Sequence, residues 1–208
     1  MLIIPFAEAK AEIRVLNSRF IARLFPVFSQ EEARKHISEV KAANPGAAHN
    51  VPAFIIGGGK NRLEYCSDDG EPAGSSGKPL LSVLKGSGLG NVLIVVTRYF
   101  GGTLLGMGGL VKAYSEAGRA VIGVTRRAEL VFTDRLCFTL PYHYYDKAKL
   151  LLDEYSAFVI EENFGEEVFI KADLAKDASA DFIGRLKELS GGKLAPRKEN
   201  GEPRSRLV

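Results

Sequence analysis

The sequence predicts an α+β protein of two domains, followed by a short polar tail. Its 208 residues exceed what one small core requires and suit two compact domains. Most of the 22 glycines fall between Gly57 and Gly109, which indicates tight turns or close backbone approaches there. After Gly123 the pattern becomes strand, helix, strand, strand, helix. The expected boundaries are 1–125 for the first domain, 126–195 for the second and 196–208 for the tail.

Composition and charge are those of an ordinary globular protein with a mildly basic first domain. Hydrophobic residues make up 46% and charged residues 25% of the chain. Residues 1–125 hold 14 Lys or Arg against 10 Asp or Glu, a balance of +4, whereas residues 126–208 hold 14 against 15, a balance of −1. The first domain is therefore the better candidate for contact with a polyanion.

The N-terminus and the cysteines indicate a cytoplasmic protein. No stretch reaches the roughly 20 apolar residues of a membrane helix, and the N-terminus lacks the basic start of a signal peptide. Cys66 and Cys137 are far apart and fit no metal or redox spacing, so we expect two reduced thiols. We expect no membrane partner.

The first domain begins with strands around one amphipathic helix. Ser29 suits the N-cap of that helix, and Glu32 three residues later completes a capping box. The sequence Asn-Pro-Gly from Asn44 ends the helix. The strands expected here are 19–27, 49–56 and 62–67, with 57–59 as the turn of a hairpin between the last two.

The glycine-rich half of the first domain surrounds one buried strand. A loop at 67–79 leads into a helix that begins near Pro79 and runs to about Lys85, because proline is favoured in a first helical turn. The aliphatic run 91–97 predicts a strand that is covered on both faces. A second glycine loop, 101–109, precedes an amphipathic helix. Its apolar stripe consists of Leu110, Tyr114, Ala117 and Val121.

The second domain shows the element order of a ferredoxin-like domain. Alternation of apolar and polar residues predicts a strand at 129–140. Apolar residues at helical spacing predict helices at 147–155 and 177–190. The remaining elements are a hairpin of 157–162 with 166–174 and a short last strand near Lys193.

Three carboxylates lie close together in the first glycine-rich loop. Asp68, Asp69 and Glu71 could hold a magnesium ion that binds a phosphate. Alternatively, they serve the turn itself, since Asp bonds its own following backbone and Gly70 supplies a permissive position. The magnesium site is the weaker of these two interpretations.

The same loop ends in small residues and a cation beside a helix start. Ser75 and Lys78 resemble part of a phosphate-binding P-loop, but Pro72 and Pro79 stand where that motif needs glycine and Ser or Thr. What remains is an anion site at the free N–H groups of a helix start. A tight loop packed on its own domain explains the residues equally well.

The buried strand ends in a cation and two aromatic residues. Arg98 and Tyr99, followed by Gly101 and Gly102, could hold a phosphate and stack a base. Alternatively, Arg98 pairs with Asp68 or Asp69. For the second aromatic residue, Phe100, we favour a place in the core.

The second glycine loop offers a further anion site. Gly108 and Gly109 precede a helix that exposes Lys112, and a helix N-terminus beside a lysine favours anions. Close packing of the helix on the sheet would also require small residues here. The spacing does not match a dinucleotide-binding fingerprint.

Three stretches of the first domain resemble the signature of the YigZ/IMPACT family. They are SDDGEPAGSSGKPLL, NVLIVVTRYFGG and LGMGGLVKAYSEAG, and the opening NSRFIARLFPV and the AHN ending at Asn50 also match. The resemblance implies a first domain of the ribosomal protein S5 domain 2-like fold, and a ferredoxin-like second domain. It also adds His49 and Asn50 to the candidate binding residues. Thr103-Leu104-Leu105 departs from the pattern, in which we expect a lysine before the leucine.

The resemblance implies binding to nucleic acid or ribosomes and a link to the regulation of translation. In this first hypothesis, Lys78, Arg98 and Lys112 contact phosphates. A second hypothesis is a Mg-dependent enzyme that acts on a phosphorylated small molecule or nucleotide in a pocket between the glycine loops. A third is an adaptor that binds a protein partner through the second sheet. No recognisable catalytic triad is present, so we assign no catalytic residue and no required cofactor, and favour the RNA or ribosome hypothesis.

Overall fold

The computed structural model describes residues 2–59 and 62–208, which form two compact units. The first unit extends to Glu129 and also includes Ser205–Val208, and the second unit is Leu130–Arg204. The α+β class and the two-part organisation are confirmed. None of the helices in the described ranges combines the length and apolarity needed to span a bilayer.

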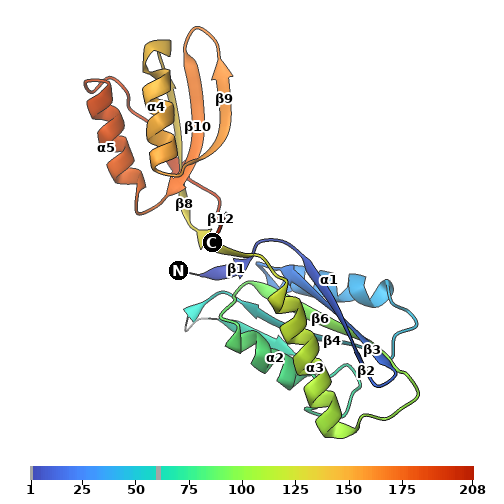
Figure 1. The fold of residues 1–208 in the computed structure, drawn as a ribbon. Coiled ribbons are helices and arrows are strands. Elements are labelled where there is room, and N and C mark those ends of the chain that lie inside the picture. Colours follow the sequence, from blue (N-terminus) through green and yellow to red (C-terminus); the bar gives the residue numbers. More distant parts are fainter. Residues whose placement is uncertain (1, 60–61) are drawn as a thin grey trace. The chain divides into compact units, whose positions relative to one another are not determined.

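The first unit is built on a five-stranded antiparallel sheet with helices on both faces (Figure 1). The strand order is β2-β3-β6-β4-β5. The strands are β2 (Ala9–Val15), β3 (Ser18–Pro26), β4 (His49–Ile56), β5 (Leu63–Cys66) and β6 (Val92–Tyr99). The helices are α1 (Gln30–Ala42), α2 (Gly77–Gly86) and α3 (Gly106–Gly123). The edge strand β2 has no counterpart in the sequence-based prediction.

The central strand β6 contributes to two separate cores. Val92, Ile94 and Val96 pack under α2 and α3, whereas Leu93 and Val95 pack under α1. This alternation is what a strand covered on both faces requires, so the prediction for the run 91–97 is confirmed. The predicted stripe of α3 is also buried under this sheet.

Local signals placed the start of α1 correctly. The Ser29 Oγ accepts a hydrogen bond from the Glu32 N–H at 3.1 Å, as expected of an N-cap. The return bond differs from a capping box, because the Glu32 carboxylate accepts from the Phe28 N–H at 2.7 Å. The predicted hairpin of β4 and β5 is confirmed by their antiparallel pairing, although its turn includes residues outside the described ranges.

The predicted strand 129–140 is two strands. Phe132 separates β7 (Arg127–Val131) from β8 (Thr133–Leu140). They belong to different sheets, because β7 lies between β1 (Ile3–Pro5) and β12 (Arg204–Leu207), while β8 lies inside the second unit. A continuous alternating pattern cannot show which sheet each half joins.

The second unit has one sheet with two helices on the same face (Figure 1). Its strand order is β11-β8-β10-β9 and all neighbouring strands are antiparallel. The further elements are α4 (Tyr142–Glu154), β9 (Phe158–Phe164), β10 (Val168–Ala175), α5 (Ser179–Leu189) and β11 (Arg197–Asn200). Helix α4 begins five residues earlier than predicted, because Pro141 occupies the N-cap position in an extended conformation ahead of an aromatic turn.

The segment 196–208 is not a loose tail. Its first part forms β11, which pairs with β8, and its second part forms β12, which pairs with β7. The Arg204 guanidinium also reaches the buried Asp173 carboxylate at 2.8 Å. The sequence-based prediction missed these strands because the segment is polar, and exposed edge strands are often rich in charge.

Candidate functional site

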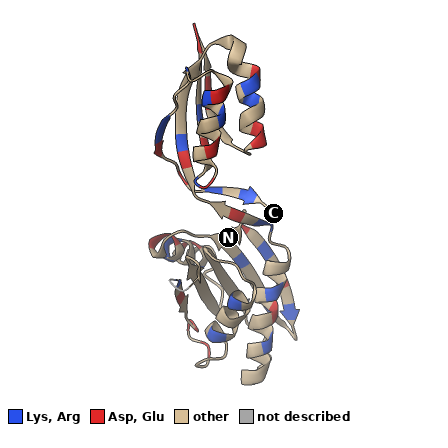
Figure 2. Ribbon diagram, turned by 90° about the vertical axis from the view of Figure 1, so that its left-hand side faces the viewer, with Lys and Arg blue, Asp and Glu red and all other residues tan. Residues whose placement is uncertain are grey.

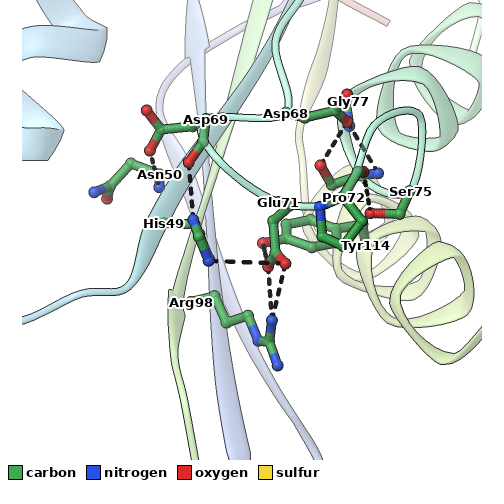
Figure 3. Close-up of polar contacts among 11 residues, drawn as sticks. His49, Asn50, Asp68, Asp69, Glu71, Pro72, Ser75, Gly77, Arg98 and Tyr114 are labelled. Atoms are coloured by element: carbon green, nitrogen blue, oxygen red, sulfur yellow. Dashed lines mark hydrogen bonds and ion pairs between the residues drawn. The ribbon is translucent and has the colours of Figure 1, made fainter. Parts of the chain in front are cut away.

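The carboxylate of Asp68 caps the start of α2 (Figure 3). Its Oδ1 accepts hydrogen bonds from the Ser76 Oγ at 2.7 Å and the Gly77 N–H at 2.8 Å, and its Oδ2 accepts one from the Gly74 N–H at 2.8 Å. Burial by itself would raise the pKa of Asp68, but these hydrogen bonds outweigh it and lower the pKa. Asp68 thus holds the loop on the helix.

Asp69 fixes the other side of the loop. Its backbone has a φ of +45°, a left-handed conformation that Asp tolerates better than most residues. Its Oδ2 accepts from the Asn50 N–H at 2.6 Å, and its Oδ1 accepts from the Lys41 ammonium at 3.1 Å. Asn50 in turn accepts a hydrogen bond from the Thr97 hydroxyl, so it is a buried link within the sheet.

Glu71 is buried at the centre of a polar cluster (Figure 3). Its two oxygens accept from Arg98 Nη1 at 2.8 and 3.0 Å, and Oε1 also accepts from the Tyr114 hydroxyl at 2.7 Å. Burial and the adjacent Glu71 carboxylate raise the pKa of Tyr114. Arg98 therefore pairs with Glu71, and neither Asp68 nor Asp69 is its partner.

His49 joins the cluster from the start of β4. Its Nδ1 lies 2.8 Å from the Asp69 carbonyl oxygen, which can only accept, so Nδ1 carries a proton. Its Nε2 lies 3.8 Å from Glu71 Oε2. The backbone carbonyl thus orients the ring, and Nε2 faces Glu71.

The three acidic residues do not converge on one point. Asp68 serves the start of α2, Asp69 serves Asn50 and Lys41, and Glu71 serves Arg98 and Tyr114. Among the residues that the structure describes, no group of three or more His, Cys, Asp or Glu is arranged to hold a metal ion. A magnesium ion would have to displace protein donors that already occupy these oxygens.

A pocket of about 510 Å³ opens above this cluster. Its polar floor consists of His49, Glu71 and Arg98, and its walls are mainly apolar. The walls are Ala48, Pro72, Phe100, Leu104, Leu105, Met107 and Leu110. The pocket lies between the two glycine loops, where the enzyme hypothesis expected one.

Phe100 belongs to the wall of this pocket. Its side chain is 49% exposed, so the expected place in the core is wrong. The strand ends at Tyr99, and Phe100 follows it into the loop, where its ring lies 5.5 Å from the Arg98 guanidinium carbon. Leu104 and Met107 continue the apolar surface from this loop and are still more exposed.

Helix α3 begins beside the same pocket. It starts at Gly106, whose φ of +67° requires glycine, and its N-cap Leu105 has no side-chain acceptor for the first N–H groups. A Cβ added at Gly108 would meet nothing within 4 Å, and one at Gly109 would meet only the side chain of Leu105 at 3.1 Å. Packing of helix on sheet therefore does not explain either glycine.

The other predicted contacts of the glycine loops lie outside the pocket. Ser75 is buried and its hydroxyl donates to the Pro72 carbonyl oxygen at 2.6 Å, which supports a tight, self-packed loop. Lys78 and Lys112 are exposed, and neither lines the pocket. Gly101 packs against the backbone of Asn17, so its glycine is structural, while Gly102 adopts a φ of +84°.

Tyr99 lies on the opposite face of the sheet from Arg98, because neighbouring residues of a strand alternate. Its hydroxyl donates to the Asn44 Oδ1 at 2.9 Å. The Arg19 guanidinium carbon lies 4.9 Å from the centre of its ring. The predicted pair of Arg98 and Tyr99 therefore serves two separate surfaces.

This opposite face carries a cluster of cations on β2 and β3. Lys10 is directly opposite Arg23, and Arg14 is directly opposite Arg19. Glu12 is the one acid between these pairs, 3.6 Å from Arg14 and 3.7 Å from Arg19. We call Lys10, Arg14, Arg19 and Arg23 the cationic face.

The second unit has no comparable excess of one charge on its open sheet face. Lys171 lies 3.8 Å from Glu161, Arg135 lies 2.7 Å from Asp173, and Arg197 lies 2.8 Å from Glu199. Figure 2 shows Lys and Arg interleaved with Asp and Glu over this unit.

The structure thus joins three of the predicted residues, His49, Glu71 and Arg98, at one pocket and distributes the others around it. Sequence reasoning missed the role of Tyr114, whose buried hydroxyl needs a partner that an apolar stripe does not show. It also missed the cationic face, because β2 was not predicted and the register of two strands is needed to align their charges.

Two family models match the chain, one in each unit. Residues 16–122 match the Impact N-terminal domain, and residues 138–193 match a domain of unknown function, DUF1949. The first match spans the pocket, both glycine loops and two of the four residues of the cationic face, Arg19 and Arg23.

Individual proteins and one solved structure are similar over nearly the whole chain. IMPACT family member YigZ of Escherichia coli is 35% identical over 92% of this chain and 95% of its own length. IMPACT family member YvyE of Bacillus subtilis is 35% identical over 88% of this chain and 83% of its own. A crystal structure described as that of a hypothetical protein is 32% identical, covers 97% of this chain and 98% of its own, and has a TM-score of 0.63.

Proposed function

Because this chain belongs to the IMPACT family, we propose that it is a cytoplasmic protein that binds RNA on the ribosome and takes part in the regulation of translation. The observation that carries the proposal is the cationic face of β2 and β3. It places Lys10, Arg14, Arg19 and Arg23 on adjacent strands with one acid among them. RNA phosphates are the polyanion that such a surface attracts.

The arrangement of these cations is unfavourable for the free protein. Like charges directly opposite each other on neighbouring strands repel, and each such pair destabilises a sheet by a fraction of a kcal/mol. Lys10 with Arg23 and Arg14 with Arg19 are two such pairs. Phosphates bound across the pairs would replace this repulsion with attraction.

An aromatic side chain stands beside the cations. Tyr99 is directly opposite Arg19 on the next strand, and its ring lies under the Arg19 guanidinium. A partly exposed ring next to cations can stack an unpaired base while the cations hold its phosphates. This feature favours single-stranded or looped RNA over a regular duplex.

The proposal places the RNA contact away from the glycine loops. Arg98 is buried against Glu71, so only Lys78 and Lys112 remain there as exposed cations from the expected phosphate contacts. They lie on the helices of the other sheet face. We therefore assign the main contact to β2 and β3.

We assign the two units to the S5 domain 2-like and ferredoxin-like folds. For the second unit, the element order strand, helix, strand, strand, helix, strand with sheet order β11-β8-β10-β9 supports the assignment. Its paired charges favour a protein partner over RNA on the open sheet face, since they leave little net charge for phosphates.

The test is co-sedimentation with ribosomes and binding to a single-stranded RNA at several salt concentrations. Three double variants each remove two exposed or half-exposed cations, so that all three variants have the same net charge. They are Lys10→Gln/Arg23→Gln on the cationic face, Lys78→Gln/Lys112→Gln at the glycine loops and Lys147→Gln/Lys187→Gln in the second unit.

Only the variant of the cationic face should lose binding strongly. Its affinity should fall roughly 10-fold or more, and the slope of log affinity against log salt should decrease by about 0.7 for each lost contact with single-stranded RNA. Equal losses in all three variants would indicate a nonspecific charge effect. A larger loss at Lys78 and Lys112 would return the site to the glycine loops, and binding that does not depend on salt would refute the proposal.

A further inference from the structure

We propose that the pocket at the start of α3 binds a small monocarboxylate with an apolar body. This inference does not depend on RNA binding, because the pocket and the cationic face use different residues on opposite faces of the sheet. It rests on hydrogen-bond donors among the residues that line the pocket and on the apolar side chains that make up most of its walls.

The first group of donors is the N-terminus of α3. Gly106 and Met107 line the pocket, and the first N–H groups of an α-helix have no partner within the helix. The N-cap, Leu105, provides no side-chain acceptor for them. A Cβ added at Gly106 or Gly108 would meet nothing within 4 Å, so no other group that the structure describes packs against these two positions, and the helix dipole makes this end attractive to an anion.

The second donor is Arg98 in the pocket floor. The residue is only 5% exposed, yet it uses Nη1 alone to bond Glu71. Its Nε is buried and has no hydrogen-bond partner in the part of the chain that the structure describes. A buried N–H of a charged group is costly to leave unpaired, so an acceptor from a ligand would complete the guanidinium.

The charges of the floor select a monoanion. Glu71 already balances the charge of Arg98 at 2.8 Å, so the floor attracts an anion through its free donors and the helix N-terminus rather than through a large net charge. A second negative charge on the ligand would face Glu71 or the apolar walls, and neither stabilises it. A carboxylate fits these conditions better than a phosphate.

The walls define the rest of the ligand. A pocket of about 510 Å³ is within the range of small-molecule sites. Leu104 is 85% exposed and Met107 is 61% exposed, so the mouth presents large apolar side chains to water. An aliphatic or aromatic body of the ligand would cover them and release that water.

The test uses the full chain and follows its backbone amides by NMR during titration with octanoate. The amides of residues 106–109 should shift in a saturable manner. Octanamide, which has no charge, and octyl phosphate, which carries more charge, should both bind more weakly. Shortening octanoate should lower the affinity by about fourfold for each methylene that leaves the pocket.

Two substitutions on α3 provide the matched control. Met107→Glu puts a carboxylate at the pocket mouth and should abolish octanoate binding, while Glu in a first helical turn is compatible with folding. Val111→Glu adds the same charge one turn later, at a residue that is 38% exposed and does not line the pocket, and should change the affinity less than twofold. Equal binding of octanamide, tighter binding of octyl phosphate, or retained binding by Met107→Glu would overturn the proposal, as would the absence of any shift at 106–109.

Discussion

The two units each bury a carboxylate against arginine, but the two clusters are completed in different ways. In the second unit, Asp173 accepts from Arg135 Nε and Nη2 at 2.7 and 2.9 Å and from Arg204 Nε and Nη2 at 2.9 and 2.8 Å. In the first unit, the Glu71 carboxylate accepts hydrogen bonds from Nη1 of Arg98 and from the Tyr114 hydroxyl. The guanidinium that faces Glu71 keeps a buried N–H without a partner in the described part of the chain.

This difference separates a structural ion pair from a candidate binding site. The acid of the second unit has two arginines and no exposed surface, so nothing is left for a ligand. The pair in the first unit borders a pocket of about 510 Å³, and the buried Arg98 Nε has no partner in the described part of the chain. A buried ion pair is by itself weak evidence of function, and its unused hydrogen-bonding capacity is what makes Arg98 informative.

The largest expected effect on stability is at Asp173, whose carboxylate accepts hydrogen bonds from both Arg135 and Arg204. Asp173→Ala leaves Arg135 and Arg204 as partly buried charges without their partner, and should cost about 3–5 kcal/mol in the free energy of unfolding. Urea unfolding followed by circular dichroism measures it. Glu161→Ala, which removes an exposed acid from the same sheet face, is the control and should cost less than about 0.5 kcal/mol. Similar losses in the two variants would show that the buried pair is not special.

Glu71→Gln should lower the stability by less than Asp173→Ala does, and it should strengthen the binding of octanoate. Glutamine keeps an acceptor for the Arg98 and Tyr114 donors but removes the balancing charge, so we expect a loss of about 2 kcal/mol. The unbalanced guanidinium should then bind octanoate more tightly than the wild-type chain does. Isothermal titration calorimetry tests this, and unchanged or weaker octanoate binding would contradict the role assigned to Arg98.

The cap that Asp68 provides at the start of α2 should make part of the stability of the first unit depend on pH. Hydrogen bonds lower the pKa of Asp68 in the folded chain, so its stabilisation is complete above the unfolded value of about 3.9 and is lost as pH falls through the folded value. Asp68→Asn should cost about 1–2 kcal/mol at pH 7. The difference from wild type should shrink below about pH 4, and a difference that is constant down to pH 2 would refute the assignment.

Apart from the control Glu161→Ala, Tyr114→Phe should have the smallest effect on stability of these substitutions. It removes one hydrogen bond to Glu71 Oε1, while Arg98 still donates to both oxygens, so we expect a loss of about 1 kcal/mol. Thermal unfolding is sufficient to detect it. A loss as large as that of Asp173→Ala would mean that the Glu71 cluster contributes as much to stability as the Asp173 cluster. The proposed difference between a binding site and a structural ion pair would then be wrong.

Much of the local structure could be predicted from the sequence. Ser29 with Glu32 located the start of α1, the aliphatic run 91–97 located the doubly covered β6, and the spacing of Leu110, Tyr114, Ala117 and Val121 identified the buried side of α3. Each of these features depends on residues that lie close to one another in the sequence. Capping and periodic burial can therefore be predicted directly from the local order of residues.

The candidate site was predicted only in part. His49, Glu71 and Arg98 were among the expected residues, and they do meet at the pocket. Their roles differed, because Arg98 pairs with Glu71 rather than with Asp68 or Asp69, and Phe100 is an exposed wall rather than core. Glu71 is 27 positions from Arg98 in the sequence, and no local rule selects one acid among three at such a separation.

The sequence by itself determined the class of the fold, the family and most helices and strands, since these follow from local preferences and motif order. Tertiary structure decided which charges meet: the opposition of Lys10 to Arg23 follows from strand register, and the contact of Arg204 with Asp173 follows from the return of the C-terminal segment. It also decided that the two glycine loops enclose an apolar pocket. Such juxtapositions depend on pairing between distant segments, where a shift of one residue moves every side chain to the other face.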